Sequence, residues 1–165
     1  MKKVIDGKAL VYCEGAFNTP NGKTAHGLVR FTERYEVVGV LDEKYAGSDA
    51  GDVLDGRPNG IPVFKDINNM PTYLVIGLAP DGGRLPKEAK GTIKAALQQG
   101  WNVDSGLHDF LTNDSELVAL AKEKNVKIRD IRKTPDRDQL HFFTGDIEKV
   151  DCLKLAILGT DSALG

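Results

Sequence analysis

The stretch TYLVIGLAPDGGRLPKEAKGTIKAALQQGWNVDSG, residues 72–106, has the pattern of a strand, a helix and a second strand. Residues 72–79 form an apolar run of strand length, and residues 101–106 have the pattern of a shorter strand. Between them, residues 86–100 carry a proline near the start, apolar residues at helical spacing and a glycine at the end. This order predicts a strand–helix–strand unit, and therefore a parallel sheet with helices packed against it.

Similar segments continue the alternation on both sides of this unit. Further strands are predicted at residues 8–14, 36–42, 126–131 and 153–158. Residues 61–67 are a weaker candidate, because Pro62 disfavours a central strand. A second helix is predicted near residues 115–124, with Asp114 or Ser115 as its N-cap. The chain is therefore expected to form an α/β fold, with a mostly parallel sheet of at least five strands and helices on both faces.

The composition is that of an ordinary globular chain. Its 165 residues are 41% hydrophobic and carry a formal net charge of −2, and the charged residues alternate in sign. These values disfavour nucleic acid and anionic lipid as partners, and no run has the pattern of a membrane span or a signal peptide. We expect a cytoplasmic protein with a small-molecule substrate, no nucleic-acid or membrane partner, and a homo-oligomeric assembly.

The sequence predicts no metal site. Cys13 and Cys152 lie far apart, in or beside apolar segments, whereas a zinc site needs closer cysteine and histidine grouping. We expect two buried structural thiols. The acidic segment AGSDAGDVLDG, residues 46–56, lacks calcium-loop spacing and is expected to be a solvated loop.

Turn-forming residues replace the strand and helix patterns after residue 133. We expect residues 1–133 to form one domain, residues 134–151 to be a linker, and residues 152–165 to begin a second domain. There, the predicted strand 153–158 runs into a glycine-containing loop, which is the typical setting of a phosphate site. The candidate phosphate-binding residues are Gly159, Thr160, Asp161, Ser162 and Gly165.

This terminal loop departs from the common phosphate-loop pattern. Five residues separate Gly159 from Gly165, where the common pattern has four between its glycines. The lysine and the hydroxyl residue that should follow are not in the sequence, so we expect the chain to be a truncated part of a longer protein. The spacing is similar to that of dethiobiotin synthetases, whose loop begins Gly-Thr-Asp. The alternative is a strand followed by a glycine- and serine-containing tail.

Gly22, Lys23 and Thr24 are an alternative phosphate site. They follow the first predicted strand and mimic the end of a phosphate loop, but six residues separate Gly15 from Gly22. An ordinary loop is the other interpretation. The dinucleotide fingerprint G-x-G-x-x-G is absent from this loop. Asp42, at the end of the second predicted strand, could still bind a ribose, and the alternative is that it is a turn residue.

Two loops that follow consecutive strands carry the candidate substrate site. Ligands collect beyond the carboxyl ends of parallel strands, where Gly82 and Gly83 would let the backbone approach a ligand and Arg84 would clamp a carboxylate or phosphate. His108, in the next loop, is the candidate general base, and Asp109 beside it is a further substrate-binding candidate. The alternatives are a plain turn around Arg84 and a structural role for Asp109. Consecutive parallel strands usually lie side by side, so we predict that both loops share one crevice.

Five long motifs resemble, in the same order, those of one bacterial and archaeal family, formerly a domain of unknown function and now associated with D-glutamate N-acetyltransferase. They are YCEGAFNTPNGKTAHGLVR (12–30), AGSDAGDVLDGRPNGIPV (46–63), VIGLAPDGGRLP (75–86), SGLHDFL (105–111) and LGTDSALG (158–165). The resemblance implies a Rossmann-like, doubly wound N-terminal domain, followed by a P-loop domain like that of dethiobiotin synthetase. It also implies that the terminal loop is the first part of that phosphate loop.

The resemblance implies that the intact protein is an N-acetyltransferase that acetylates the amino group of an acidic amino acid such as D-glutamate with acetyl-CoA. Acyl transfer to an amine needs a base, for which His108 is the candidate, and Arg84 would hold the substrate. The alternatives are an ATP- and Mg²⁺-dependent ligase resembling dethiobiotin synthetase, and a non-catalytic nucleotide-binding or assembly module. Because the phosphate loop is incomplete, we expect the 165-residue chain by itself to bind no cofactor and to be inactive.

Overall fold

The computed structural model describes residues 5–67, 71–140 and 144–155. The chain divides into two compact units, residues 1–133 and 134–165. In its described part, the second unit contains two short 3₁₀ turns, Arg137–Gln139 and Asp146–Lys149. The candidate residues discussed below, apart from the terminal loop, all belong to the first unit.

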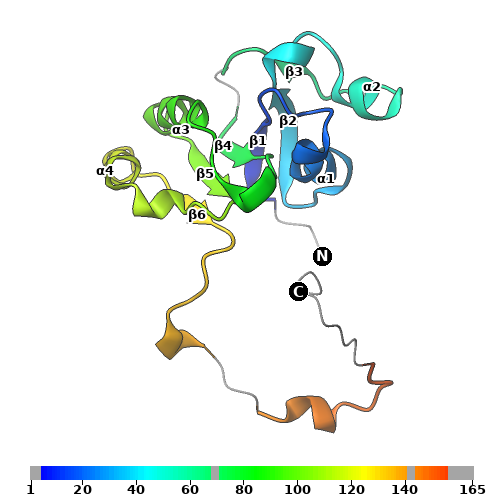
Figure 1. Cartoon of the computed structure of the whole chain (residues 1–165), viewed down its shortest axis with the longest axis vertical. Coiled ribbons are helices and arrows are strands. Elements are labelled where there is room, and N and C mark those ends of the chain that lie inside the picture. The colour runs from blue at the N-terminus through cyan, green and yellow to red at the C-terminus, as the bar shows by residue number, and fades with distance from the viewer. Residues whose placement is uncertain (1–4, 68–70, 141–143, 156–165) are drawn as a thin grey trace. The chain divides into compact units, whose positions relative to one another are not determined.

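The first unit is built around one parallel sheet (Figure 1). Its strands are β1 (Gly7–Tyr12), β2 (Tyr35–Leu41), β3 (Val63–Phe64), β4 (Tyr73–Ile76), β5 (Asn102–Ser105) and β6 (Ile128–Asp130). They lie in the order β3-β2-β1-β4-β5-β6, and every neighbouring pair is parallel. This topology confirms the predicted Rossmann-like α/β fold. The strand order reverses between β1 and β4, because the chain runs outward from β1 to β3 and then restarts beside β1.

The α-helices of the described residues pack against the sheet in two pairs (Figure 1). They are α1 (Lys23–Phe31), α2 (Ala50–Asp55), α3 (Ala89–Gln98) and α4 (Ser115–Glu123). Helix α1 packs beside α2, and α3 packs beside α4. The chain moves in opposite directions from β1 and from β4, and right-handed crossovers therefore place the two pairs on opposite faces. The helices predicted from the sequence, α3 and α4, are confirmed.

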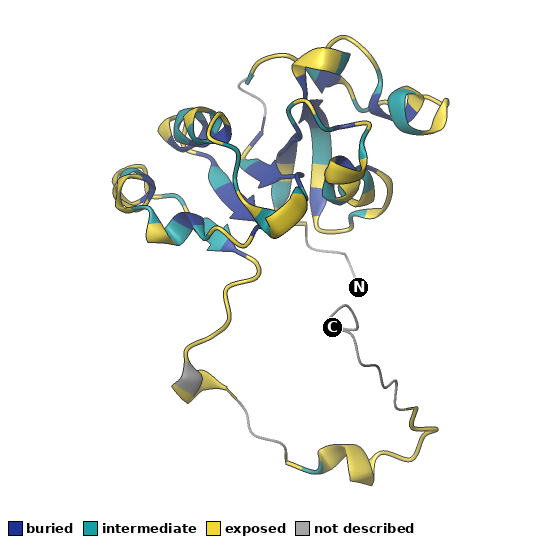
Figure 2. Ribbon diagram, viewed as in Figure 1, coloured by how far each residue is buried: buried dark blue, intermediate teal, exposed yellow. Residues whose placement is uncertain are grey.

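The hydrophobic core lies between the sheet and the helices on its two faces. Residues 9–12 of β1 are all buried, as expected for a central strand with helices on both faces. Figure 2 shows the buried residues concentrated in the strands and on the inward sides of the helices. Leu74 on β4 and Val103 on β5 extend the same core and are fully buried.

Two aspartates, Asp114 and Asp49, are the N-caps of α4 and α2. The side chain of Asp114 accepts hydrogen bonds from the N–H groups of Glu116 and Leu117, which confirms it as the N-cap of α4. The acidic segment 46–56 is not the expected solvated loop, because it contains α2. The carboxylate of Asp49 accepts hydrogen bonds from four backbone N–H groups and fixes the start of this helix. The donors are Gly51, Asp52, Asn59 and Gly60.

The expectations for the end of the chain are corrected in part. Residues 153–155, the described part of the predicted strand 153–158, are not in a strand, and Leu153 is 84% exposed. A strand needs a neighbour for its backbone groups, and the described part of the second unit contains none. Cys152 is exposed rather than buried, whereas Cys13 is buried as expected. The candidate phosphate loop, Gly159 to Gly165, lies outside the described residues.

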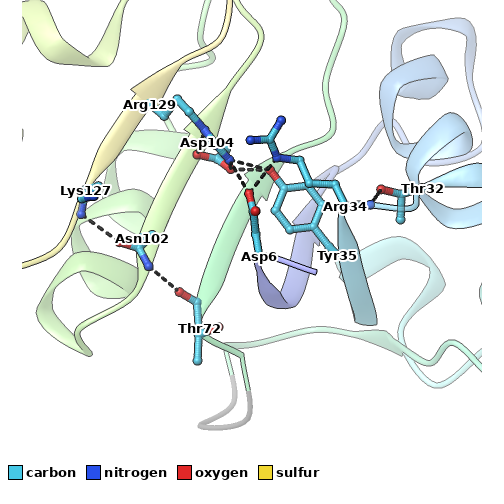
Figure 3. A network of polar contacts seen from close by, with 9 residues as sticks. All are labelled: Asp6, Thr32, Arg34, Tyr35, Thr72, Asn102, Asp104, Lys127 and Arg129. Atoms are coloured by element: carbon cyan, nitrogen blue, oxygen red, sulfur yellow. Dashed lines mark hydrogen bonds and ion pairs between the residues drawn. The ribbon is translucent and has the colours of Figure 1, made fainter. Parts of the chain in front are cut away.

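A network of polar side chains links the residue before β1 to strands β2, β5 and β6 (Figure 3). Arg129 donates from Nε to Asp104 Oδ1 at 2.9 Å and from Nη2 to Asp6 at 3.1 Å, and Tyr35 donates its hydroxyl to Asp104. Arg34 also pairs with Asp6, and the two guanidinium groups hold the pKa of this carboxyl below its ordinary value. Burial, followed by the bond to Asp104, raises the pKa of Tyr35. The network ties β5 and β6 to the amino-terminal ends of β1 and β2, and the carboxyl ends of the strands carry the candidate site.

Candidate functional site

The candidate site lies where the strand order reverses, at the carboxyl ends of β1 and β4. In open α/β sheets ligands bind in the crevice beyond these ends. The loops after the two strands contact each other directly, since Ala79 N–H donates to the carbonyl of Asn21 at 2.7 Å. Ala25 N–H, in the first turn of α1, donates to the carbonyl of Gly77 at 2.9 Å. A Cβ at Gly77 would lie 2.7 Å from the Cβ of Ala25, so glycine is needed for this close approach.

The loop after β4 also contacts the loop after β5. His108 N–H donates to the carbonyl of Gly83 at 2.8 Å, and a Cβ at Gly83 would lie 2.1 Å from Cδ2 of His108. Gly82 and Gly83 both have positive φ, +72° and +62°, which glycine adopts without strain. The two glycines therefore shape a turn against which the imidazole of His108 packs. The predicted proximity of the two loops is confirmed.

A cavity of about 370 Å³ opens between these loops, and we call it the edge cavity. It is lined by Lys23, Thr24, Leu78, Ala79, Pro80, Asp81, Gly82, Gly83, Gly106, Leu107, His108 and Arg132. The lining comes from the start of α1 and from the segments that follow β4, β5 and β6. The lining residues include two basic ones, Lys23 and Arg132, together with His108 and one acidic residue, Asp81.

Arg132 is the residue that the sequence analysis missed. Its Nη1 lies 3.2 Å from Nε2 of His108. Arg132 follows β6, and it reaches the cavity because β6 pairs with β5, the strand that precedes His108. The available signal was a cation directly after the end of a predicted strand, residues 126–131.

The loop that carries His108 is fixed by buried polar groups. The carboxylate of Asp130, which is 9% exposed, accepts hydrogen bonds from Leu111 N–H at 3.0 Å and from Thr112 N–H at 2.9 Å. Ser105 Oγ accepts from Leu107 N–H at 3.3 Å. These bonds hold the loop at both ends and so limit the positions that the imidazole can take.

Asp109 and Arg84, both expected to bind substrate, lie outside the edge cavity. Asp109 accepts a hydrogen bond from Leu85 N–H at 2.9 Å, so its carboxylate ties the two loops together. The group that contacts the imidazole Nε2 of His108 is Arg132 rather than Asp109. Arg84 is exposed and is not among the residues that line the cavity. Of the predicted substrate residues, Gly82 and Gly83 line it together with His108.

The alternative phosphate site is only partly compatible with the structure. Gly22 and Lys23 donate their N–H groups to the carbonyls of Thr19 and Pro20, in a short 3₁₀ turn (Pro20–Gly22), so these two donors are not free for a phosphate. Gly22 is buried, and a Cβ there would lie 2.5 Å from the carbonyl oxygen of Ala16. Lys23 and Thr24 do line the edge cavity, and Lys23 is exposed. The ammonium group of Lys23, rather than a glycine-rich backbone cradle, is therefore what this segment can offer to a ligand.

Two other polar groups near the carboxyl edge have structural roles. Asp42 is fully buried, and its carboxylate accepts hydrogen bonds from Phe17 N–H and Lys44 N–H, both at 3.0 Å. It is therefore the turn residue of the two interpretations, not a ribose ligand. Burial raises the pKa of the Cys13 thiol to about 12, so this group stays protonated and poorly nucleophilic near neutral pH. Within the described residues no cluster of histidine, cysteine and acidic side chains could hold a metal ion.

Comparisons with known proteins place the chain in a family. A model of Rossmann-like domains, described as the domain of unknown function DUF1611_N, matches residues 43–134. The chain belongs to the DUF1611_N family. A crystal structure of a DUF1611 family protein from Anabaena variabilis ATCC 29413 superposes with a TM-score of 0.75 at 30% identity, over 88% of this chain and 42% of that one. Amine dehydrogenase from Mycobacterium smegmatis, at 21% identity and a TM-score of 0.54, shares the fold over 78% of this chain and 40% of its own.

Two curated relatives of this DUF1611_N chain are named D-glutamate N-acetyltransferase. The one from Pseudoalteromonas sp. is 40% identical over 91 residues, and the one from Tritonibacter scottomollicae is 37% identical over 92 residues. The matches cover 55% and 56% of this chain but 26% of each relative. The matched region thus spans about a quarter of the length of these relatives. In the described parts of the chain, no helix combines the length and the apolar character needed to cross a bilayer.

Proposed function

We propose that the edge cavity is the acceptor site of an N-acetyltransferase that acts on the amino group of an acidic amino acid of the D-glutamate kind. The observation that carries this proposal is the convergence of Lys23, His108 and Arg132 on one cavity. Two cations suit the two carboxylates of such a substrate, and an imidazole suits proton removal from its ammonium group. The names and identities of the two curated relatives support the same assignment.

We propose a separate role for each of these side chains. Lys23 follows β1 and Arg132 follows β6, with β4 and β5 between these strands, so the two cations enter the cavity from different sides. Arginine binds a carboxylate through two parallel N–H donors, whereas lysine acts as a compact point charge. A volume of about 370 Å³ lies within the usual range for small-molecule sites and exceeds what one amino acid needs. The remaining space would admit the acetyl group of the donor.

The reaction requires one proton transfer from the acceptor before the bond forms. His108 would take a proton from the substrate ammonium, and the free amine would then attack the acetyl carbonyl. A carbon–nitrogen bond forms as the carbon–sulfur bond of the thioester breaks, and the sulfur leaves as a thiolate that takes up the second amine proton. We propose acetyl-CoA as the donor.

Calorimetric titration of D-glutamate into the chain tests the acceptor site. We expect saturable binding that Lys23→Ala weakens about tenfold, since a lost charge-assisted contact is worth roughly 1.5–3 kcal/mol and water recovers part of it. Arg84→Ala is the matched control, because it removes a nearby cation that does not line the cavity. Equal effects of the two substitutions would place the amino acid elsewhere.

The donor is tested on the full-length gene product. Mass spectrometry of reactions with D-glutamate and either acetyl-CoA or ATP with Mg²⁺ distinguishes N-acetylation from ligation. We expect N-acetyl-D-glutamate with acetyl-CoA and no ATP consumption. Acetylation by the full-length protein without D-glutamate binding by this chain would assign the acceptor site to another part of the protein.

A further inference from the structure

The contact between Arg132 and His108 determines which imidazole nitrogen carries a proton. A guanidinium group has donors but no acceptor, so Nε2 of His108, 3.2 Å from Nη1, has to be the acceptor. A neutral imidazole has one donor nitrogen and one acceptor nitrogen, and the proton therefore lies on Nδ1. A doubly protonated imidazole could not accept this hydrogen bond.

The same contact occupies the lone pair that a general base would use. Nε2 is the basic nitrogen of this tautomer, and Arg132 donates to it. The other nitrogen, Nδ1, already carries the ring proton and has no free lone pair with which to take up a second one. His108 is therefore blocked as a base until Arg132 moves.

We propose that an acidic substrate releases this block by drawing Arg132 onto its own carboxylate. The inference rests on the proposed function and adds a regulatory step at the same site. A carboxylate is a stronger acceptor for this guanidinium than a neutral imidazole, because the opposite charges of the two groups also attract each other. It can also engage two guanidinium N–H groups, whereas Nε2 engages one. Arg132 is exposed and follows the end of β6, so its side chain has room to change partner.

This exchange would make selectivity for acidic amino acids a property of turnover as well as of binding. A neutral analogue such as D-glutamine still has an amino group and one carboxylate, but it lacks the second carboxylate. If Lys23 holds the only carboxylate, Arg132 stays on His108 and the base stays blocked. Removing the guanidinium should therefore narrow the kcat difference between D-glutamate and D-glutamine, while it raises KM for D-glutamate.

The test is ¹⁵N NMR of the histidine rings in the chain, with His108→Gln used to assign the resonances. In the free chain we expect an unprotonated Nε2 that accepts a hydrogen bond. Arg132→Ala should shift the Nε2 resonance, and Arg84→Ala should leave it in place. Saturating D-glutamate should shift it in the wild type in the direction of the Arg132→Ala signal, and D-glutamine should shift it less.

Two results of the binding and NMR experiments would overturn the inference and leave the proposed function standing. One is calorimetric binding of D-glutamate with no change at Nε2, and the other is an Nε2 resonance that Arg132→Ala does not move. A failure of D-glutamate to bind, measured in the same samples by calorimetry, would instead reject the acceptor site and the exchange together. In the full-length gene product, an unchanged kcat ratio between the two substrates in Arg132→Ala would also contradict the exchange.

Discussion

Asp104 on β5 and Arg129 on β6 are register partners in the sheet, and the guanidinium of Arg129 donates from Nε to Oδ1 of Asp104 at 2.9 Å. Asp104 is 3% exposed and also accepts the hydroxyl of Tyr35 (Figure 3). A buried carboxylate is tolerated when its oxygens are fully hydrogen-bonded. The pair therefore holds the edge strand β6 in register, and through β6 it sets where Arg132 leaves the sheet.

Removing this carboxylate should destabilise the fold. We expect Asp104→Ala to lower the free energy of unfolding by about 2–3 kcal/mol, because the Tyr35 hydroxyl and the guanidinium of Arg129 lose a buried acceptor. Urea denaturation at neutral pH, followed by circular dichroism, measures the loss. Asp6→Ala is the control, since Asp6 is exposed and should cost much less. Equal losses would show that the burial of Asp104 contributes nothing.

Most of the strands and the helices α3 and α4 were predictable because each has a local signal. The β1, β4 and α3 segments combine an apolar pattern with clear punctuation, such as Pro86 before α3 and Gly100 after it. The two-residue strand β3 and the six-residue helix α2 are too short for a hydrophobic period to be recognised. The start of α2 is fixed by the carboxylate of Asp49, and the sequence of this segment has no repeating apolar pattern that would indicate a helix.

The candidate site was predictable only to the extent that it depends on strand ends. His108, Gly82 and Gly83 follow consecutive strands, so a parallel sheet brings them together. Arg132 depends on the pairing of β6 with β5, a long-range contact that no local motif encodes. Asp109 was a substrate-binding candidate because it follows His108 in the sequence, but its carboxylate accepts a hydrogen bond from Leu85 N–H and ties two loops together.

The N-cap of α4 should make stability depend on pH in the acid range. The bond to Lys90, aided by the N–H groups of the first helical turn, holds the pKa of Asp114 below its ordinary value of 3.8. A carboxyl whose pKa is lowered by folding stabilises the folded state fully above 3.8, and this contribution is lost as the pH falls through the lower, folded-state pKa. We expect Asp114→Ala to cost about 1 kcal/mol at neutral pH.

The measurement is urea denaturation of wild type and Asp114→Ala at several pH values. The difference between the two proteins should shrink once the pH falls below 3.8. Asp114→Asn keeps a side-chain oxygen for the cap but loses the charge, so it should retain part of the stability and show less pH dependence. A difference that stays constant down to acid pH would contradict the assignment.

The two cysteines should react at very different rates. Cys13 is fully buried, and its thiol pKa is raised to about 12, whereas Cys152 is exposed. Because the thiolate is the reactive form, we expect a disulfide reagent to label Cys152 quickly and Cys13 only when the fold opens. Colour development in native buffer should fall to near zero in Cys152→Ala and return in denaturant. Rapid labelling of that variant in native buffer would mean that β1 opens at its carboxyl end.

Gly82 and Gly83 form a matched pair for the geometry of the edge cavity. Both have positive φ, so alanine at either position should cost about 1–2 kcal/mol of backbone strain. A Cβ at Gly82 would have nothing within 4 Å, whereas a Cβ at Gly83 would lie 2.1 Å from Cδ2 of His108. Gly83→Ala therefore has to displace the imidazole in addition to straining the turn.

We expect Gly83→Ala to weaken D-glutamate binding and to shift the ring resonances of His108, while Gly82→Ala loses comparable stability and leaves those resonances close to their wild-type positions. Calorimetry and ¹⁵N NMR on both variants, with urea denaturation to match their stabilities, make the comparison. The strain term is common to the two substitutions, so the difference between them isolates the contact with His108. If both variants shifted the His108 resonances equally, turn strain rather than this contact would determine where the imidazole lies.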